Sequence, residues 1–134
     1  MTPDDRASIE AVLVRYLDAI DRFDFDTVGA CFAEGARASY GGQPAVEGRQ
    51  AIVDLLRSSH TAEASTHLLG GVVLEPAGEA VGARSTVVAY LVRGGKVRVR
   101  GLRYEDRLVR EAGGWIILDR VHSLSWMSEV PVVA

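Results

Sequence analysis

One histidine stands out in an otherwise apolar segment. The stretch ASTHLLGGVVLE, residues 64–75, is apolar nearly throughout and β-branched in its second half, and it ends before Pro76, so it predicts a buried strand that carries His67. Imidazole is the side chain best suited to moving protons near neutral pH. His67 is therefore the first candidate for chemistry. The alternative is a core histidine whose ring is hydrogen-bonded to the backbone.

A possible partner for this imidazole is Asp21, at the end of a segment with helical periodicity. At about 100° per residue, Asp21 projects from the border of the apolar stripe, beside Leu17, whereas Asp18 projects from the polar face. A carboxylate that accepts from one imidazole nitrogen fixes the tautomer and raises the basicity of the other nitrogen. Asp21 and His67 are thus a candidate acid–base pair. The alternative for Asp21 is a surface carboxylate at a helix C-terminus, where the helix macrodipole disfavours it.

The remaining histidines have plainer interpretations. His60 follows RSS at the end of a predicted helix, where a surface cation suits the helix dipole. His122 alternates with apolar residues, which places it at a pocket mouth or a subunit interface. The three histidines lack metal-ligand spacing, and the sequence has no CxxC, HExxH or glycine-rich phosphate loop. We therefore predict no metal site and no cofactor.

The elements that position these residues are helices first and strands afterwards. Thr2 is a plausible N-cap with Pro3 at the first helical position, and apolar residues then recur at helical spacing up to Ile20. Glycine-containing turns, RGGK and EAGG, separate the last strands, so these are expected to pair antiparallel in order. The predicted elements are helices over the segment ending at Asp21, over DFDTVGACF and over 48–60, a short strand ARASY, and strands 64–75, 79–92, 97–110 and 115–126. The pattern predicts an α+β fold, with the helices covering one face of a curved sheet.

Composition limits the function classes. The 134 residues suit one domain, 1–134, and the net charge of −3 gives no basic field for a nucleic acid. No run of about 18 apolar residues predicts a membrane span, and the N-terminus lacks the apolar core of a signal peptide. The single Cys31 lies in an apolar run and cannot form an internal disulfide, so a reducing, cytoplasmic setting is expected.

Arginines crowd strand 97–110, and neither of its faces is uniformly apolar. The expected role of these arginines is a solvated or subunit-facing surface with cross-strand ion pairs. Exposed sheet edges and the apolar tail SEVPVVA add to this pattern. We therefore expect a homo-oligomer, a dimer or a trimer.

Five stretches together resemble the SnoaL-like branch of the nuclear transport factor 2-like superfamily, of the scytalone dehydratase and polyketide cyclase type. They are RYLDAIDRFDFDTVGACF, EGRQAIVDLL, STHLLGGVVLE, RYEDRLVREAGGWIILDRV and the late Trp126. The likeness covers about residues 5–127. It implies a cone-shaped α+β fold, with N-terminal helices packed on a strongly curved, mainly antiparallel sheet and a pocket inside the cone. Because this fold hosts many reactions, the resemblance indicates the fold more specifically than the chemistry.

Carried over residue by residue, the resemblance implies that Asp21 and His67 form the acid–base pair and that Tyr40 orients a water or a substrate oxygen. Other pocket positions differ from those of the dehydratase. The family's second tyrosine is replaced by Ile20, its second histidine by Tyr90, and its serine and asparagine by Leu102 and Tyr104. These replacements make the pocket less polar and favour a hydrophobic or aromatic substrate over scytalone.

The predicted function is a cofactor-independent acid–base enzyme, a dehydratase, cyclase or isomerase acting on a small hydrophobic or polyketide-like carbonyl substrate. Two alternatives remain open at this point. One is a module of the same fold that binds a small ligand or assembles without turnover, favoured by the missing second histidine. The other is an epoxide hydrolase in which Asp21 activates water.

Overall fold

The computed structural model describes residues 1–133, and its first helix begins where the sequence predicts. Helix α1 (Pro3–Asp21) starts at a capping box: Asp5 N donates to Thr2 Oγ1 at 3.0 Å, and Thr2 N donates to Asp5 Oδ2 at 2.9 Å. One face of α1 is buried, at Ile9, Val12, Leu13, Tyr16, Leu17, Ala19 and Ile20. This apolar face packs the helix against β3 and β6.

Two shorter helices follow the predicted pattern. Helix α2 (Phe25–Ala30) is capped by Asp24, whose Oδ1 accepts from Thr27 N at 3.1 Å. Helix α3 (Arg49–Ser59) buries Ile52 and Leu56 and packs against β1 and α2. Together the three helices bury the apolar stripes that the sequence places on them.

A single six-stranded sheet has the order β2-β1-β6-β5-β4-β3. Its strands are β1 (Phe32–Tyr40), β2 (Val46–Glu47), β3 (Ala64–Ala77), β4 (Ala80–Arg93), β5 (Lys96–Glu111) and β6 (Gly114–Pro131). The antiparallel pairing of β3 through β6 is confirmed. Three features were not predicted: the short β2, the parallel pairing of β1 with β6, and the extension of β6 past residue 126 to Pro131.

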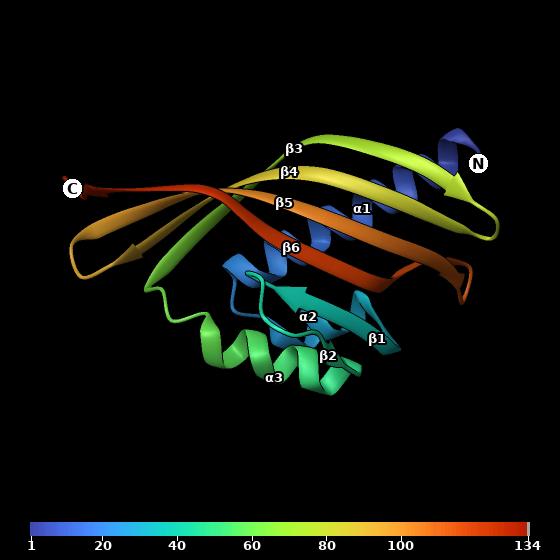
Figure 1. The fold of residues 1–134 in the computed structure, drawn as a ribbon, viewed down its shortest axis with the longest axis horizontal. Helices are drawn as coiled ribbons and strands as arrows, with labels where there is room; N and C mark the ends of the chain where they lie inside the picture. Colours follow the sequence, from blue (N-terminus) through green and yellow to red (C-terminus); the bar gives the residue numbers. More distant parts are fainter. Residues whose placement is uncertain (134) are drawn as a thin grey trace.

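The sheet curves around α1 (Figure 1). The register of β3 shifts between Leu69 and Val72, at the Gly70–Gly71 pair that the sequence places mid-strand. In Figure 1, α1 runs along one face of the strands while α2 and α3 lie near β1. This arrangement is the predicted α+β fold, with its N-terminal helices packed on a mostly antiparallel sheet. Within residues 1–133, no helix is long and apolar enough to cross a membrane.

Strand β5 has a definite inner face, although its sequence is mixed. Leu102, Tyr104, Asp106 and Leu108 are buried, whereas the residues between them, 103, 105 and 107, are exposed. Arg98 and Arg100 continue the inner row toward the β4–β5 hairpin. The row therefore passes from packed core to the wall of a cavity.

Candidate active site

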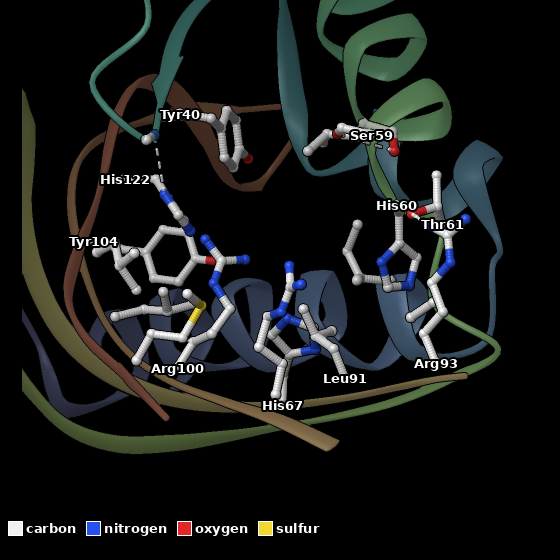
Figure 2. Close-up of a pocket in the computed structure, with 18 of the residues that line it drawn as sticks. Tyr40, Ser59, His60, Thr61, His67, Leu91, Arg93, Arg100, Tyr104 and His122 are labelled. Atoms are coloured by element: carbon white, nitrogen blue, oxygen red, sulfur yellow. Dashed lines mark hydrogen bonds between the residues drawn. The ribbon is translucent and has the colours of Figure 1, made fainter. Parts of the chain in front are cut away.

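A cavity of about 670 Å³ lies between α1, the end of α3 and the inner face of the sheet. Its polar lining includes Tyr16, Tyr40, His60, His67, Arg100, Tyr104 and His122, and its apolar lining includes Ile20, Leu56, Leu91, Leu102, Leu124 and Met127. Figure 2 shows the labelled side chains facing this space. Such a mixture of apolar walls and a few polar groups is typical of a small-molecule site.

Asp21 and His67 meet at the wall of the cavity. His67 Nδ1 lies 2.6 Å from Asp21 Oδ1, and the backbone N–H of His67 donates to Asp21 Oδ2 at 2.7 Å. Ser65 Oγ also donates to Oδ1, at 2.7 Å. A carboxylate only accepts, so Nδ1 carries the hydrogen that it donates to Asp21, and Nε2 is the ring nitrogen left for a substrate. The last residue of α1 thus fixes both the position and the tautomer of a strand histidine.

His60 lies beside this pair instead of on the surface, and the predicted surface cation is wrong. Its ring stacks on Phe23 at 4.7 Å between centroids, and its Nε2 is 3.3 Å from Ser65 Oγ. Burial, together with nearby His67, lowers the pKa of His60. Because the Ser65 hydroxyl donates its hydrogen to Asp21, its oxygen accepts a hydrogen bond from His60 Nε2. His60 is consequently a neutral neighbour of the acid–base pair.

Three tyrosines, Tyr16, Tyr40 and Tyr104, line another part of the cavity, and a buried arginine packs behind them. The hydroxyls of Tyr16 and Tyr40 lie 2.7 Å apart, and Arg120 sits 4.2 Å from the ring centroids of both Tyr16 and Tyr104. Arg120 donates twice to Asp106, at 2.7 and 3.0 Å. Burial raises the pKa of each tyrosine above its usual value, so all three keep their hydroxyl hydrogens at neutral pH.

His122 lies between two of these rings, 5.0 Å from Tyr40 and 5.1 Å from Tyr104 between centroids. The N–H of Gly41 donates to the carbonyl of His122 at 3.0 Å and toward its Nδ1 at 3.3 Å. Burial, reinforced by two nearby arginines, lowers the pKa of His122 to about 4. The ring is therefore neutral, with its hydrogen on Nε2, and it is a donor at the cavity wall.

Most of the sequence-predicted residues gather at this cavity. Ile20, Tyr40, His67, Leu102 and Tyr104 line it, and Asp21 holds His67 in place.

Tyr90 does not join them, so its predicted place in the pocket is wrong. The register pairs His67 with Ala89, which shares the inner face and is fully buried. Tyr90 therefore projects from the outer face, where it is 38% exposed.

Sequence reasoning missed several lining or supporting residues, and each had a weak positional signal. Tyr16 precedes Ile20 by one helical turn, Ser65 precedes His67 by two strand positions, and Arg100 precedes Leu102 by two. The spacing puts each on the same face as a residue already assigned to the pocket. These residues were missed because their types suggested other roles. Tyr16 counts as apolar in a helical stripe, and Arg100 belongs to a strand rich in arginines that were expected on the surface.

Comparisons with known proteins identify the family and the fold. The SnoaL-like domain matches residues 2–121. The chain belongs to the SnoaL-like domain family. An uncharacterized protein of Mycobacterium tuberculosis is 29% identical to this SnoaL-like domain over 124 residues, which cover 89% of the chain and 84% of that relative.

Solved structures share the fold of this SnoaL-like domain closely. A scytalone dehydratase-like protein from Novosphingobium aromaticivorans superimposes with a TM-score of 0.85 at 20% identity, covering 96% of this chain and 89% of the other. A type 2 hexachlorocyclohexane dehydrochlorinase has a TM-score of 0.85 at 16% identity, covering 96% and 90%. The fold is accordingly that of the nuclear transport factor 2-like superfamily.

Across residues 1–133, no three His, Cys, Asp or Glu side chains are grouped so as to hold a metal ion. The polar lining of the cavity consists of tyrosine, serine and threonine hydroxyls, imidazoles, basic side chains and the carboxylate of Glu129.

Proposed function

We propose that the protein is a cofactor-independent acid–base enzyme that removes a proton next to the carbonyl of a small hydrophobic substrate. The observation that carries this proposal is the contact of 2.6 Å between His67 Nδ1 and Asp21 Oδ1, which leaves the second imidazole nitrogen as a base at the cavity wall. Positioned proton transfer of this kind is worth about 10²–10⁴-fold in rate. That is sufficient for a substrate whose C–H bond is already activated by a carbonyl.

In the proposed reaction, Nε2 of His67 takes a proton from the carbon beside the carbonyl, and the C–H electron pair moves into an enolate. Tyr40, paired with Tyr16 at 2.7 Å, supplies a hydroxyl donor for the enolate oxygen. For a β-hydroxy carbonyl, the enolate then expels the hydroxyl, which leaves as water after His67 returns the proton. In an isomerisation, His67 would return the same proton to another carbon of the substrate. In a cyclisation, the enolate carbon would instead form a bond to a second carbonyl carbon of the substrate.

The neighbouring structures are consistent with elimination chemistry. One is scytalone dehydratase-like and another is a dehydrochlorinase. Both reactions remove a proton and a leaving group from adjacent carbons. At 16–20% identity these likenesses support the fold alone, so the proposal depends on the residues of this chain.

The contacts of Asp21 argue against its use as the base of an epoxide hydrolase. Its Oδ1 accepts from His67 Nδ1 and from Ser65, and its Oδ2 accepts from the His67 backbone. A carboxylate with both oxygens engaged in this way is suited to orienting an imidazole. Activation of water by Asp21 would require it to give up at least one of these bonds.

Proton exchange tests the proposal without knowledge of the natural substrate. Propiophenone and 3-hydroxy-1-phenylpropan-1-one are incubated with the protein in D₂O, and deuterium incorporation beside the carbonyl is followed by NMR. The expected result is exchange of both ketones above the buffer rate, with loss of water from the hydroxy ketone. If the ketones bind, as judged by thermal shift, yet neither exchanges, the protein is a binding module of this fold.

We also propose that the chain forms a homo-oligomer, a dimer or a trimer, and works in a reducing compartment. β1 pairs with β6 only as far as His122, so within residues 1–133 one edge of β6 lacks a neighbouring strand beyond that residue. Two large apolar side chains on this segment are exposed and do not line the cavity: Trp126 and Val130. An open edge with apolar side chains is suited to pairing with a second copy. The single, buried Cys31 supports the compartment.

A further inference from the structure

Charge on the cavity wall is opposite in sign to that of the whole chain. The chain carries a net charge of −3. Four basic side chains line the cavity near the β4–β5 hairpin and the following strand, namely Arg93, Lys96, Arg98 and Arg100, against one lining carboxylate, Glu129. A cavity wall with this excess of positive charge favours an anionic ligand.

Three of the four basic groups already have partners. Lys96 Nζ and Arg98 Nε each lie 3.4 Å from an oxygen of Glu129, so the rim carboxylate is satisfied. Arg93 donates to the hydroxyl of Thr61 at 2.8 Å. Within residues 1–133, no carboxylate or carbonyl is hydrogen-bonded or ion-paired to Arg100. Of the four, Arg100 is thus the side chain that is left to bind a ligand entering the cavity.

Arg100 also lies deeper than the rim. It is half-buried, and Figure 2 shows its guanidinium extending into the cavity beside Tyr104 and His122. Its strand neighbours are Ala89 on β4 and Met127 on β6, neither of which is charged. A half-buried guanidinium without a counter-ion is unfavourable in the empty protein and gains most from an anion that displaces its water.

The groups around Arg100 are donors. Neutral His122 offers Nε2–H because Gly41 N–H points to its Nδ1. Tyr104 retains its hydroxyl hydrogen, because burial raises its pKa. A planar guanidinium flanked by two further donors matches a carboxylate, which accepts through two oxygens.

We propose that the substrate is a hydrophobic keto acid whose carboxylate binds Arg100, with His122 and Tyr104 at its flanks. The apolar body then lies against Ile20 and Leu102 and presents its carbonyl-activated carbon to His67. Calling this ligand a substrate rests on the proposed function, but binding of a carboxylate by Arg100 does not. It can therefore be tested without turnover.

Calorimetric titration with a matched pair of ligands tests this site. The pair is 5-oxo-5-phenylpentanoate and its primary amide, which has the same shape without the charge. Wild-type protein is expected to bind the acid about tenfold or more tightly than the amide, because a charge-assisted hydrogen bond is roughly twice as strong as a neutral one. The preference should vanish in Arg100→Gln, return in part in Arg100→Lys, and persist in Arg107→Gln, whose arginine pairs with Asp119 on the outer face.

Each outcome has a defined meaning. Equal affinity of acid and amide for wild type, no acid binding at millimolar concentration, or a preference that survives Arg100→Gln overturns the carboxylate site. Circular dichroism and unchanged affinity for the amide show that Arg100→Gln is folded. A strong acid preference without deuterium exchange at C4 of either ligand upholds the site and refutes the proposed enzyme. Exchange without acid preference does the reverse.

Discussion

Three donors converge on the two oxygens of Asp21, and this convergence is the main chemical feature of the cavity. The Nδ1–H and backbone N–H of His67 and the hydroxyl of Ser65 all lie within 2.7 Å of the carboxylate. The backbone N–H and Ser65 hold the carboxylate in place, and the carboxylate in turn holds the imidazole through Nδ1. The orientation of the base is thus set before any substrate binds, which is a condition for efficient proton transfer.

His122 predicts a specific acid sensitivity of folding. Its pKa of about 4 lies below the ordinary value of 6.5 for a histidine in the unfolded chain. The unfolded state therefore binds more protons between these pH values, so this contribution is complete above pH 6.5 and is lost as the pH falls toward 4. The loss is on the order of 3 kcal/mol. His122→Gln lacks the titrating ring and should not show it.

Urea unfolding at pH 7, 5.5 and 4 measures this effect as the difference between wild type and His122→Gln. Carboxylates that titrate in the same range affect both proteins and cancel in the comparison. Unfolding free energies that decline in parallel for the two proteins would show that His122 is not held neutral by its surroundings.

At the scale of elements, two of the ion pairs between β5 and β6 differ strongly in burial. Arg120 and Asp106 are paired in the core, while Arg107 and Asp119 pair on the exposed face of the same two strands. Asp106→Asn leaves a buried guanidinium without its counter-ion, and the expected loss of stability is about 3–5 kcal/mol. Asp119→Asn is the matched control, and its expected cost is below about 1 kcal/mol.

Thermal and urea unfolding of the two variants give this comparison directly. The tyrosine wall should loosen in Asp106→Asn, since Arg120 packs on the rings of Tyr16 and Tyr104. Equal costs for the two substitutions would mean that the buried pair contributes no more than a surface one.

The helices and the antiparallel meander were predictable because their signals are local. Capping residues mark the start of α1, helical spacing marks its buried face, and glycines with positive φ close the hairpins at 94–95 and 113. The pairing of β1 with β6 brings residues 32–40 beside 117–122, and no local pattern specifies such a contact. The short β2 depends on that arrangement as well.

Site residues were predictable where their position within one helix or strand determined the direction of the side chain. The prediction failed where the direction depended on the register between two strands. The place of Asp21 in the site was predicted from its position at the border of the apolar helix stripe. That of His67 was predicted from its position in an apolar strand. Tyr90 fails because the register with β3 puts Ala89 on the inner face. Arg100 went unrecognised because the two faces of β5 look alike until burial separates them.

For the whole molecule, the open edge of β6 predicts association. Light scattering on purified protein at micromolar concentration is expected to return a dimer or a trimer. Trp126→Glu and Val130→Glu place charges on the exposed apolar segment and should shift the mass toward the monomer. Val73→Glu is the control, because the Val73 side chain is exposed on β3, away from this segment. It should leave the mass unchanged. A monomeric wild type would contradict this prediction.

The central claim is that Asp21 and His67 act as one proton-transfer unit, and exchange kinetics test it most directly. The rate of deuterium incorporation beside the carbonyl of the neutral 5-oxo-5-phenylpentanamide is measured by NMR for wild type, Asp21→Asn, His67→Ala and the double variant. Asp18→Asn, altered on the exposed face of the same helix, is the control. The neutral amide keeps the test independent of Arg100.

Each single change at the pair should slow exchange by about 10²–10⁴-fold while the affinity for the amide is retained. The double variant should be no more than a few-fold slower than His67→Ala, because both changes disable the same unit. Asp18→Asn should exchange at the wild-type rate. Exchange that persists in His67→Ala, or losses that multiply in the double variant, would contradict the account.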